Sequence, residues 1–284
     1  TGIEDSKGTN NGTNNGATKY PGFVNTLAGA STGMSQSNLV QSDLQTVAPY
    51  SKYALAFDGT NDIIDCGSDS SLTPTTAFSV SCWVYLNATG TQTILHNGGG
   101  NNDGYILYFF GSNLRFYIRD GGSWKYLNSD NAFVANTWYN VTVTWGGSTM
   151  KMYINNALQS NTATASSISI NTRFRIGAYG GSSNILNGRL SNVSVWNSEL
   201  TSAQAAEIYN EGLPSDLNTF SGAAPVAWWQ LGSNSSWNGN RWIVADEIGS
   251  NNGYSQNMSP YMPESGLTNG VGTTANGVST GMSE

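Results

Sequence analysis

The stretch Phe78-Ser-Val-Ser-Cys-Trp-Val-Tyr-Leu86 decides the fold class of this 284-residue chain. Every second position in it is apolar, which is the period of a β-strand with one buried face. The residues at these positions are Phe78, Val80, Cys82, Val84 and Leu86. The same period returns in Trp138-Tyr-Asn-Val-Thr-Val-Thr-Trp145, through Val141, Val143 and Trp145. We expect both sets of side chains to point into a core between two sheets.

Short runs of this kind continue from Tyr53 to Trp196, with turn residues between them. The other runs are Tyr53–Phe57, Tyr105–Phe110, Leu114–Ile118, Met150–Ile154, Arg173–Ile176 and Arg189–Trp196. Many short strands separated by turns about every eight to twelve positions are typical of a sandwich. The sequence therefore predicts an all-β, antiparallel β-sandwich with long, loop-rich terminal segments.

Two tight turns are also predicted within this region. Gly111-Ser112-Asn113 suits a three-residue hairpin connection with one residue at positive φ, and Asn155-Asn156 favours a type I′ turn.

One short helix is expected after the last run. Thr201 or Ser198 can cap its start, and Gly212 with Pro214 can stop it. Its narrow apolar stripe would lie on the sandwich and consists of Ala205, Ile208 and Tyr209.

The two ends of the chain resemble each other. Asp5-Ser-Lys-Gly-Thr-Asn-Asn-Gly12 returns as Asp246-Glu-Ile-Gly-Ser-Asn-Asn-Gly253, and Ser31–Gln36 returns as Ser279–Glu284. The order and the spacing both recur, which indicates a repeated module. The alternative is chance similarity between stretches rich in Gly, Asn and Ser.

These features divide the chain into four parts. We expect a polar leading segment over residues 1–52, draped on the sandwich of residues 53–213, and then a linker over residues 214–225. Residues 226–284 read as the start of a second, incomplete repeat. That last part would pack on the first sandwich, pair with a neighbour or belong to a module beyond residue 284.

Composition limits the classes of partner. Eleven Lys and Arg face 18 Asp and Glu, giving a net charge of -7 without a basic run, so we expect no nucleic-acid partner. No apolar stretch approaches the roughly 20 residues that span a bilayer, so we expect no membrane insertion. Cys66 and Cys82 lie among apolar neighbours, which favours buried thiols over a disulfide bridge.

The ordered motifs resemble the laminin-G-like, concanavalin A-like jelly-roll domains. Leu55-Ala-Phe-Asp-Gly-Thr-Asn-Asp-Ile63 is similar to the family's opening strand and turn, and Phe78–Val84 is similar to its second strand with a central Trp. Later motifs follow in the family's order over roughly residues 53–212: Trp138–Val143, Met152–Asn156, Ile176-Gly177, Asn187–Asn197 and Ser198–Ser202. The resemblance implies a jelly-roll sandwich.

The fold includes glycoside hydrolases, but the chain lacks their residues. A retaining glycosidase needs two carboxyl groups about 5 Å apart. No Glu occurs between Glu4 and Glu199, and the E-x-D-x-E strand of the hydrolases is absent. His96 is the only histidine, and we expect it at a solvated strand end. We therefore predict that the protein is not an enzyme.

Other members of the fold bind glycans, which implies an aromatic patch with polar groups. Alternation places Arg115, Tyr117 and Arg119 on one face of a strand, with three further candidates in the following turn and strand. These are Asp120, Trp124 and Tyr126. The alternative is that the aromatic residues only cover the edge of the core, as most aromatic residues of sandwiches do.

The resemblance also implies a calcium ion. Asp58, Asn61 and Asp62 offer oxygen ligands within one turn. The family often adds an acidic pair in a late strand, where this chain has Ser191 and Asn192, so Asn192 is the fourth candidate ligand. Asp58 and Asp62 alternatively serve as turn-forming residues.

The combined prediction is a structural or interaction protein on a virion or extracellular surface. The low-charge, Asn/Gly/Ser-rich character is similar to that of laminin-G-like modules on marine phage particles. Its partners would be copies of itself, other virion or surface proteins and a cell-surface glycan. The alternatives are a secreted carbohydrate-binding module or adhesin and, last, a glycoside hydrolase.

Overall fold

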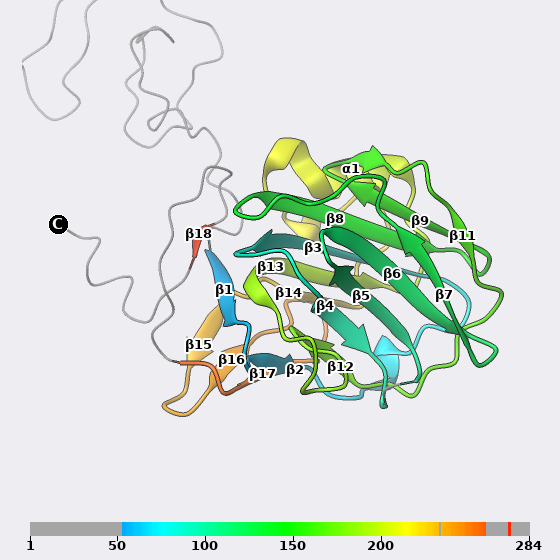
Figure 1. The fold of residues 1–284 in the computed structure, drawn as a ribbon. Helices are drawn as coiled ribbons and strands as arrows, with labels where there is room; N and C mark the ends of the chain where they lie inside the picture. Colours follow the sequence, from blue (N-terminus) through cyan, green and yellow to red (C-terminus); the bar gives the residue numbers. More distant parts are fainter. Residues whose placement is uncertain (1–52, 101, 233, 260–271, 274–284) are drawn as a thin grey trace, which may run out of the picture. The chain divides into compact units, whose positions relative to one another are not determined.

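The computed structural model describes residues 53–100, 102–232, 234–259 and 272–273 (Figure 1). The chain divides into two compact units, Thr1–Ala48 and Pro49–Glu284, and every described residue belongs to the second. The leading segment predicted for residues 1–52 lies outside the described residues. The second unit is a sandwich of two sheets whose strands are almost all antiparallel, as the sequence predicts.

The first sheet has the strand order β10-β9-β8-β3-β13-β1-β18, with β11 paired to β9 and β14 paired to β13. Its strands are β1 (Tyr53–Asp58), β3 (Phe78–Leu86), β8 (Trp138–Trp145), β9 (Thr149–Ile154), β10 (Ala157–Leu158), β11 (Ala163–Thr164), β13 (Asn187–Trp196), β14 (Ala227–Trp229) and β18 (Gly272–Thr273).

The second sheet has the order β15-β16-β17-β2-β12-β4-β5-β6-β7. Its strands are β2 (Ile63–Asp65), β4 (Gln92–Asn97), β5 (Tyr105–Phe110), β6 (Asn113–Asp120), β7 (Ser123–Asn128), β12 (Phe174–Ile176), β15 (Ser235–Trp237), β16 (Trp242–Val244) and β17 (Gly253–Gln256). In Figure 1 the strands β4 to β7 lie side by side at the front of the sandwich.

The core between the sheets is built by the predicted alternation. Phe78, Val80 and Cys82 of β3 are fully buried, as are Val141 and Val143 of β8. The aromatic ring of Phe78 stacks on Tyr105 of the opposite sheet, with ring centroids 4.3 Å apart. The inward assignment made from period-two alternation is confirmed.

Both predicted turns are present. β5 and β6 are joined by two residues, Gly111 and Ser112, instead of three, because Asn113 already pairs with Phe110. Gly111 has a φ of 64°, which suits the first position of a type II′ turn. Asn155 and Asn156 both have positive φ, as a type I′ turn requires.

The helix α1 (Ser202–Tyr209) begins at Thr201, whose side chain forms a capping box with Gln204. It ends at Asn210, which adopts the left-handed conformation two residues before the predicted stop at Gly212. The described residues also include three short 3-10 turns: η2 (Ser70–Leu72), η3 (Asn210–Gly212) and η4 (Leu217–Thr219).

Residues after the helix contribute strands to both sheets of this sandwich. β14 pairs with β13 in the first sheet, and β17 pairs with β2 in the second. Trp229 of β14 is fully buried and stacks on Phe174 of β12 across the core, with centroids 5.0 Å apart. Residues 227–256 therefore close the sandwich at the end opposite β7.

A turn at Asp246 fixes this closing segment. Its carboxylate accepts hydrogen bonds from the backbone N–H of Trp228 at 2.9 Å and of Asn251 at 3.0 Å. The Oδ1 atom of Asn252 accepts from the Asp246 N–H at 2.9 Å. The repeated motif at Asp246–Gly253 thus has a structural role here, whereas Asp5–Gly12 and Ser279–Glu284 lie outside the described residues.

The remaining sequence predictions concern the cysteines and the membrane. Cys66 and Cys82 are buried free thiols, and burial raises the pKa of both. Among the described residues, no helix has the length and apolar character that crossing a membrane requires.

Replacing Trp229 tests whether residues 227–256 belong to the sandwich. Trp229→Ala removes a buried indole and its 2.7 Å hydrogen bond to the Asn251 carbonyl, so it should cost about 3–5 kcal/mol of unfolding free energy. Leu158→Ala, at a side chain that is 58% exposed, should change it by less than about 0.5 kcal/mol. Denaturant titration measures both, and equal effects would contradict the placement of β14.

Candidate functional site

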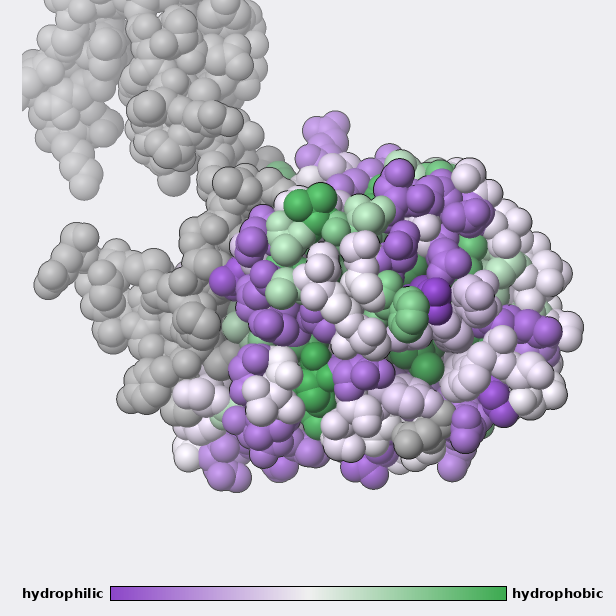
Figure 2. Space-filling model, in the orientation of Figure 1, coloured by the Kyte–Doolittle hydropathy of each residue, from purple (hydrophilic) through white to green (hydrophobic). Residues whose placement is uncertain are grey.

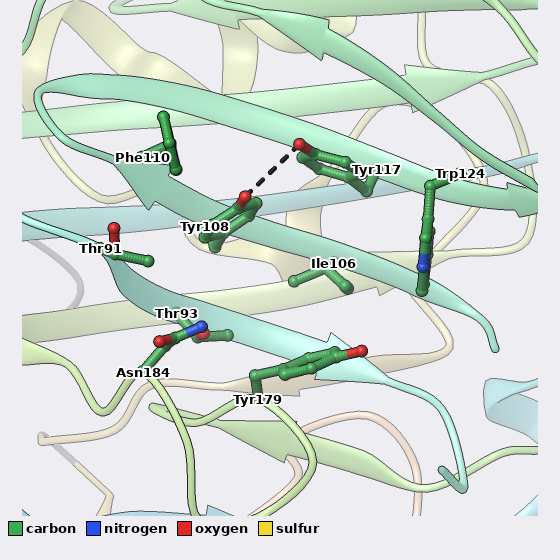
Figure 3. Close-up of a pocket in the computed structure, with 9 residues that line it drawn as sticks. All are labelled: Thr91, Thr93, Ile106, Tyr108, Phe110, Tyr117, Trp124, Tyr179 and Asn184. Carbon is green, nitrogen blue, oxygen red and sulfur yellow. Dashed lines mark hydrogen bonds between the residues drawn. The ribbon is translucent and has the colours of Figure 1, made fainter. Parts of the chain in front are cut away.

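A groove of about 260 Å³ opens on the outer face of the second sheet (Figure 3). Aromatic rings and small polar groups line it. The lining residues are Thr91, Thr93, Ile106, Tyr108, Phe110, Tyr117, Trp124, Tyr179 and Asn184. Figure 2 shows pale and hydrophobic residues set among hydrophilic ones on this side of the sandwich.

The pleat of β5 and β6 creates one side of the groove. Leu107 and Phe109 of β5 and Phe116 of β6 are fully buried in the core. Because successive side chains of a strand point to opposite faces, Tyr108 and Tyr117 must point outward. They come together there, with their hydroxyl groups 3.4 Å apart (Figure 3).

The aromatic residues of this face pack against one another. The Tyr117 ring stacks on Tyr126 at 5.0 Å and meets Trp124 edge-on at 6.0 Å. Tyr126 remains 47% exposed. Rings held in this way form a rigid platform for a ligand, because each one fixes the orientation of the next.

Two arginines extend the platform along β6. The Arg115 guanidinium lies over the Phe110 ring at 4.2 Å and donates from Nη1 to the Tyr117 hydroxyl at 3.0 Å. Arg119 lies over the Trp124 ring at 5.4 Å. Such cation–π contacts hold a guanidinium flat and keep its outer edge free to donate hydrogen bonds.

Five of the six predicted glycan-binding residues share this face, and the sixth does not. The register pairs Tyr117 with Tyr126 and Arg119 with Trp124, and Arg115 lies two residues before Tyr117. Asp120 instead faces a loop, where its carboxylate accepts hydrogen bonds from the Ser166 N–H and the Ser167 hydroxyl. These hydrogen bonds lower the pKa of Asp120 and hold it away from the groove.

The opposite wall comes from residues that sequence reasoning missed. Tyr179 and Asn184 lie in the irregular segment between β12 and β13, on the side of the groove opposite Tyr108 and Tyr117, with Asn184 beside Thr93 (Figure 3). No local pattern marks them, because long-range contacts place this segment. The outward orientation of Tyr108 could have been predicted from the sequence, since Tyr108 alternates with the buried Leu107 and Phe109 of β5.

The prediction for His96 is wrong. His96 is fully buried, because β4 lies between β12 and β5 and the loops at its end cover the ring. Its Nδ1 accepts from the Gly180 N–H at 3.2 Å, so Nε2 carries the proton that faces the Asp103 carbonyl at 3.3 Å. The ring also lies 4.8 Å from the Tyr179 ring. His96 therefore anchors the segment that carries the second wall.

The predicted calcium ligands come together only in part. Asp58 and Asp62 share one turn, in which the Asp58 N–H donates to Asp62 at 2.9 Å and Asp58 accepts from the Thr60 N–H at 2.7 Å. Asn61 lies in the same turn. Asn192 instead uses its amide on Ser191 and on the Trp228 indole at 3.1 Å, about five strand residues beyond the Asn187 that pairs with Asp58.

Direct hydrogen bonds from backbone N–H groups engage both carboxylates of this turn. Across the described residues, no three His, Cys, Asp or Glu side chains lie close enough to hold a metal together. Calcium at this turn stays a prediction that would rest on Asp58, Asn61 and Asp62.

A second cleft of about 580 Å³ lies near the other end of the same sheet. It is mostly polar, and Tyr254 is the aromatic residue in its lining. One of its two arginines, Arg173, is paired with Asp65 at 2.5 Å. The aromatic groove is therefore the better candidate for recognising a ligand.

The described strands form a β-sandwich with an aromatic groove on the outer face of its second sheet. A sequence profile of the concanavalin A-like lectin/glucanases superfamily, in its laminin-G-like branch, matches residues 58–206. This match spans more than half of the chain, and the chain belongs to that family.

Solved structures are similar to this chain at low sequence identity. A "putative carbohydrate binding protein" from Bacteroides ovatus matches with a TM-score of 0.56 and 17% identity, over 73% of this chain and 59% of that one. A SAP-like pentraxin from Limulus polyphemus matches with a TM-score of 0.45 and 20% identity, over 68% and 91%. Domain 4 of the arabinanase AbnA from Geobacillus stearothermophilus, solved with arabinotriose, matches with a TM-score of 0.43 and 16% identity, over 55% of this chain and 75% of that one. No curated protein sequence matches.

The anchoring role of His96 predicts a pH effect on stability. Burial lowers the pKa of His96 in the folded protein below its ordinary value of 6.5, so the unfolded chain takes up a proton first as the pH falls. The contribution of the buried, neutral His96 to the unfolding free energy is complete above about pH 6.5. It is lost as the pH falls toward the pKa of His96 in the folded protein. Unfolding free energies of wild type and His96→Gln between pH 5 and 7.5 measure it.

The difference between the two proteins isolates this contribution. Asp62, whose pKa burial raises to about 6, acts in the opposite sense over the same range, but it is present in both proteins and cancels. A wild-type advantage that stays constant across the range would contradict the buried, neutral His96.

Calcium is tested at the Asp58–Asp62 turn. Burial and the nearby Asp58 make a charged Asp62 unfavourable, so a bound cation would relieve the cost and raise the melting temperature. The expected result is a higher melting temperature in millimolar calcium than in chelator for wild type, and no difference for Asp62→Asn. An unchanged wild-type melting temperature would contradict the prediction of a calcium site at this turn.

Proposed function

We propose that this protein is a non-catalytic glycan-binding module whose ligand lies in the aromatic groove. The proposal rests on the two aromatic walls of the groove. Tyr117 and Trp124 form one wall and Tyr179 forms the other, with small polar and apolar side chains between them. Ligand sites are concave and mostly apolar, with a few placed polar groups, and this groove fits that description.

The chemistry of the lining matches a sugar. The C–H face of a pyranose ring packs on an aromatic face, and its hydroxyl groups need donors and acceptors at the rim. The groove offers the hydroxyls of Tyr108, Tyr117 and Tyr179 and the amide of Asn184. These groups both donate and accept, as sugar hydroxyls do.

The lining also argues against hydrolysis. A glycosidase needs two carboxyl groups on either side of the scissile bond. No Asp or Glu is among the described residues that line the groove. The relative from Bacteroides ovatus, which carries a carbohydrate-binding description, is consistent with a binding role at the level of the fold.

For its setting, we propose a module exposed on a virion or another extracellular surface, as a decoration or fibre component in contact with copies of itself. The repeat of Asp5–Gly12 at Asp246–Gly253 supports a modular array, and the low charge supports an exposed polar surface. The alternative is a secreted carbohydrate-binding module or adhesin. Fixed stoichiometry on purified particles would support the first, and a particle-free, glycan-binding monomer would support the second.

Groove variants test the glycan-binding proposal. Trp124→Ala and Tyr179→Ala each remove one wall and should weaken binding at least about tenfold, since aromatic contacts dominate such sites. Native affinity electrophoresis with soluble arabinan, galactan and pectin measures the loss as reduced retardation.

Trp237→Ala is the matched control, because Trp237 packs on Trp242 at the far end of the sheet. It should keep wild-type retardation. The proposal fails when none of the polysaccharides retards the wild type, or when both groove variants bind as the wild type does.

A further inference from the structure

The charged residues of β4 to β7 are distributed unequally between the two faces of the sheet. These strands carry four residues that are charged at neutral pH: Arg115, Arg119, Asp120 and Lys125. Arg115 and Arg119 share the face of Tyr117, because they lie two residues before and after it on β6. Asp120 is turned toward Ser166 and Ser167. These strands thus place two positive charges beside the platform, in a protein of net charge -7.

Neither arginine is neutralised by the described part of the chain. The two ion pairs found there are Lys151 with Glu199 and Arg173 with Asp65. The Nε atom of Arg115 is buried and has no hydrogen-bond partner among the described residues. An anion placed at this guanidinium would therefore meet a charge that no described carboxylate already satisfies.

The surroundings of Arg115 also hold it ready for a ligand. Its guanidinium lies 4.2 Å from the Phe110 ring centroid and 5.1 Å from that of Tyr126, and Nη1 is fixed by the Tyr117 hydroxyl. A guanidinium fixed by stacking loses little conformational entropy when it binds an anion. Planar guanidinium donors match the paired oxygens of a carboxylate or a sulfate.

The two arginines lie at different points along the groove. Arg119 lies four positions after Arg115 on β6, which is about 13 Å at the rise of a β-strand. Arg115 pairs with Tyr108 in register and lies over the Phe110 ring, and Arg119 lies over the Trp124 ring, so each arginine contacts lining residues of the groove. This spacing suits an extended ligand with more than one negative charge.

We propose that the groove selects acidic oligosaccharides, in which a uronate carboxylate or a sulfate ester binds Arg115 and a second one binds Arg119. The inference rests on the proposed glycan-binding function and names its ligand class. The sugar rings lie on Tyr117 and Trp124, and the acidic groups set the specificity. The alternative is that the arginines only stack on the aromatic rings and support them.

Calorimetry with matched pairs of probes separates these explanations. The probes are an oligogalacturonate with its carboxyl-reduced form, and a sulfated galactan oligosaccharide with its desulfated form. We expect wild type to bind at least one acidic probe at least tenfold more tightly than its neutral counterpart, with affinity falling as salt increases. The pair that shows the difference identifies the acidic group.

Substitutions then locate the selectivity. Arg115→Gln and Arg119→Gln should each weaken binding of the acidic probe at least severalfold more than they weaken binding of its neutral counterpart. Arg115→Lys should keep part of the preference, because it retains charge without the planar donors. Arg241→Gln is the matched control, since Arg241 stacks on Tyr254 at 4.4 Å outside the groove. Denaturant titration confirms that each variant folds.

Each outcome has a distinct meaning. Equal binding of acidic and neutral probes by wild type overturns the acidic preference and leaves the glycan-binding function standing. A preference that survives in both glutamine variants, or falls equally in Arg241→Gln, also overturns it. Loss of acidic and neutral binding together in the arginine variants supports the stacking explanation. No binding of any probe contradicts both proposals.

Discussion

The burial of one face of each strand between the two sheets is the constraint on which the rest of this structure depends. Phe78 stacks on Tyr105 across that layer, and Leu107, Phe109 and Phe116 fill it from the second sheet. Because neighbouring side chains alternate, filling the core with these residues turns Tyr108, Arg115 and Tyr117 outward. The candidate site is therefore the outer side of the same strands that build the core.

The groove needs a second wall, which depends on contacts between distant parts of the chain. The segment after β12 is fixed where His96 accepts from the Gly180 N–H and where the Thr93 N–H donates to the Asn184 carbonyl at 2.7 Å. Both anchors lie in β4, a strand of the sheet itself. The ligand would therefore lie between a rigid sheet and a loop tied to it, which favours a preformed site.

The sequence predicts what local physics determines. Alternation identified the inward residues of β3 and β8, and the cap at Thr201 set the start of α1. Alternation also placed Arg115, Tyr117 and Arg119 on one face. Sequence reasoning could not find the burial of His96 or the position of Tyr179, because strand pairing and loop contacts far along the chain decide both. The orientation of Asp120 could not be predicted from alternation, because a side chain at a strand end turns toward the nearest hydrogen-bond donors, here Ser166 and Ser167.

The most direct measurement is a crystal structure of the protein with the tightest-binding acidic oligosaccharide. The account predicts a sugar ring between Tyr117 and Tyr179, with acidic groups within hydrogen-bonding distance of Arg115 and Arg119. An oligosaccharide bound in the polar cleft beside Arg173 and Tyr254, with the aromatic groove unoccupied, would contradict it.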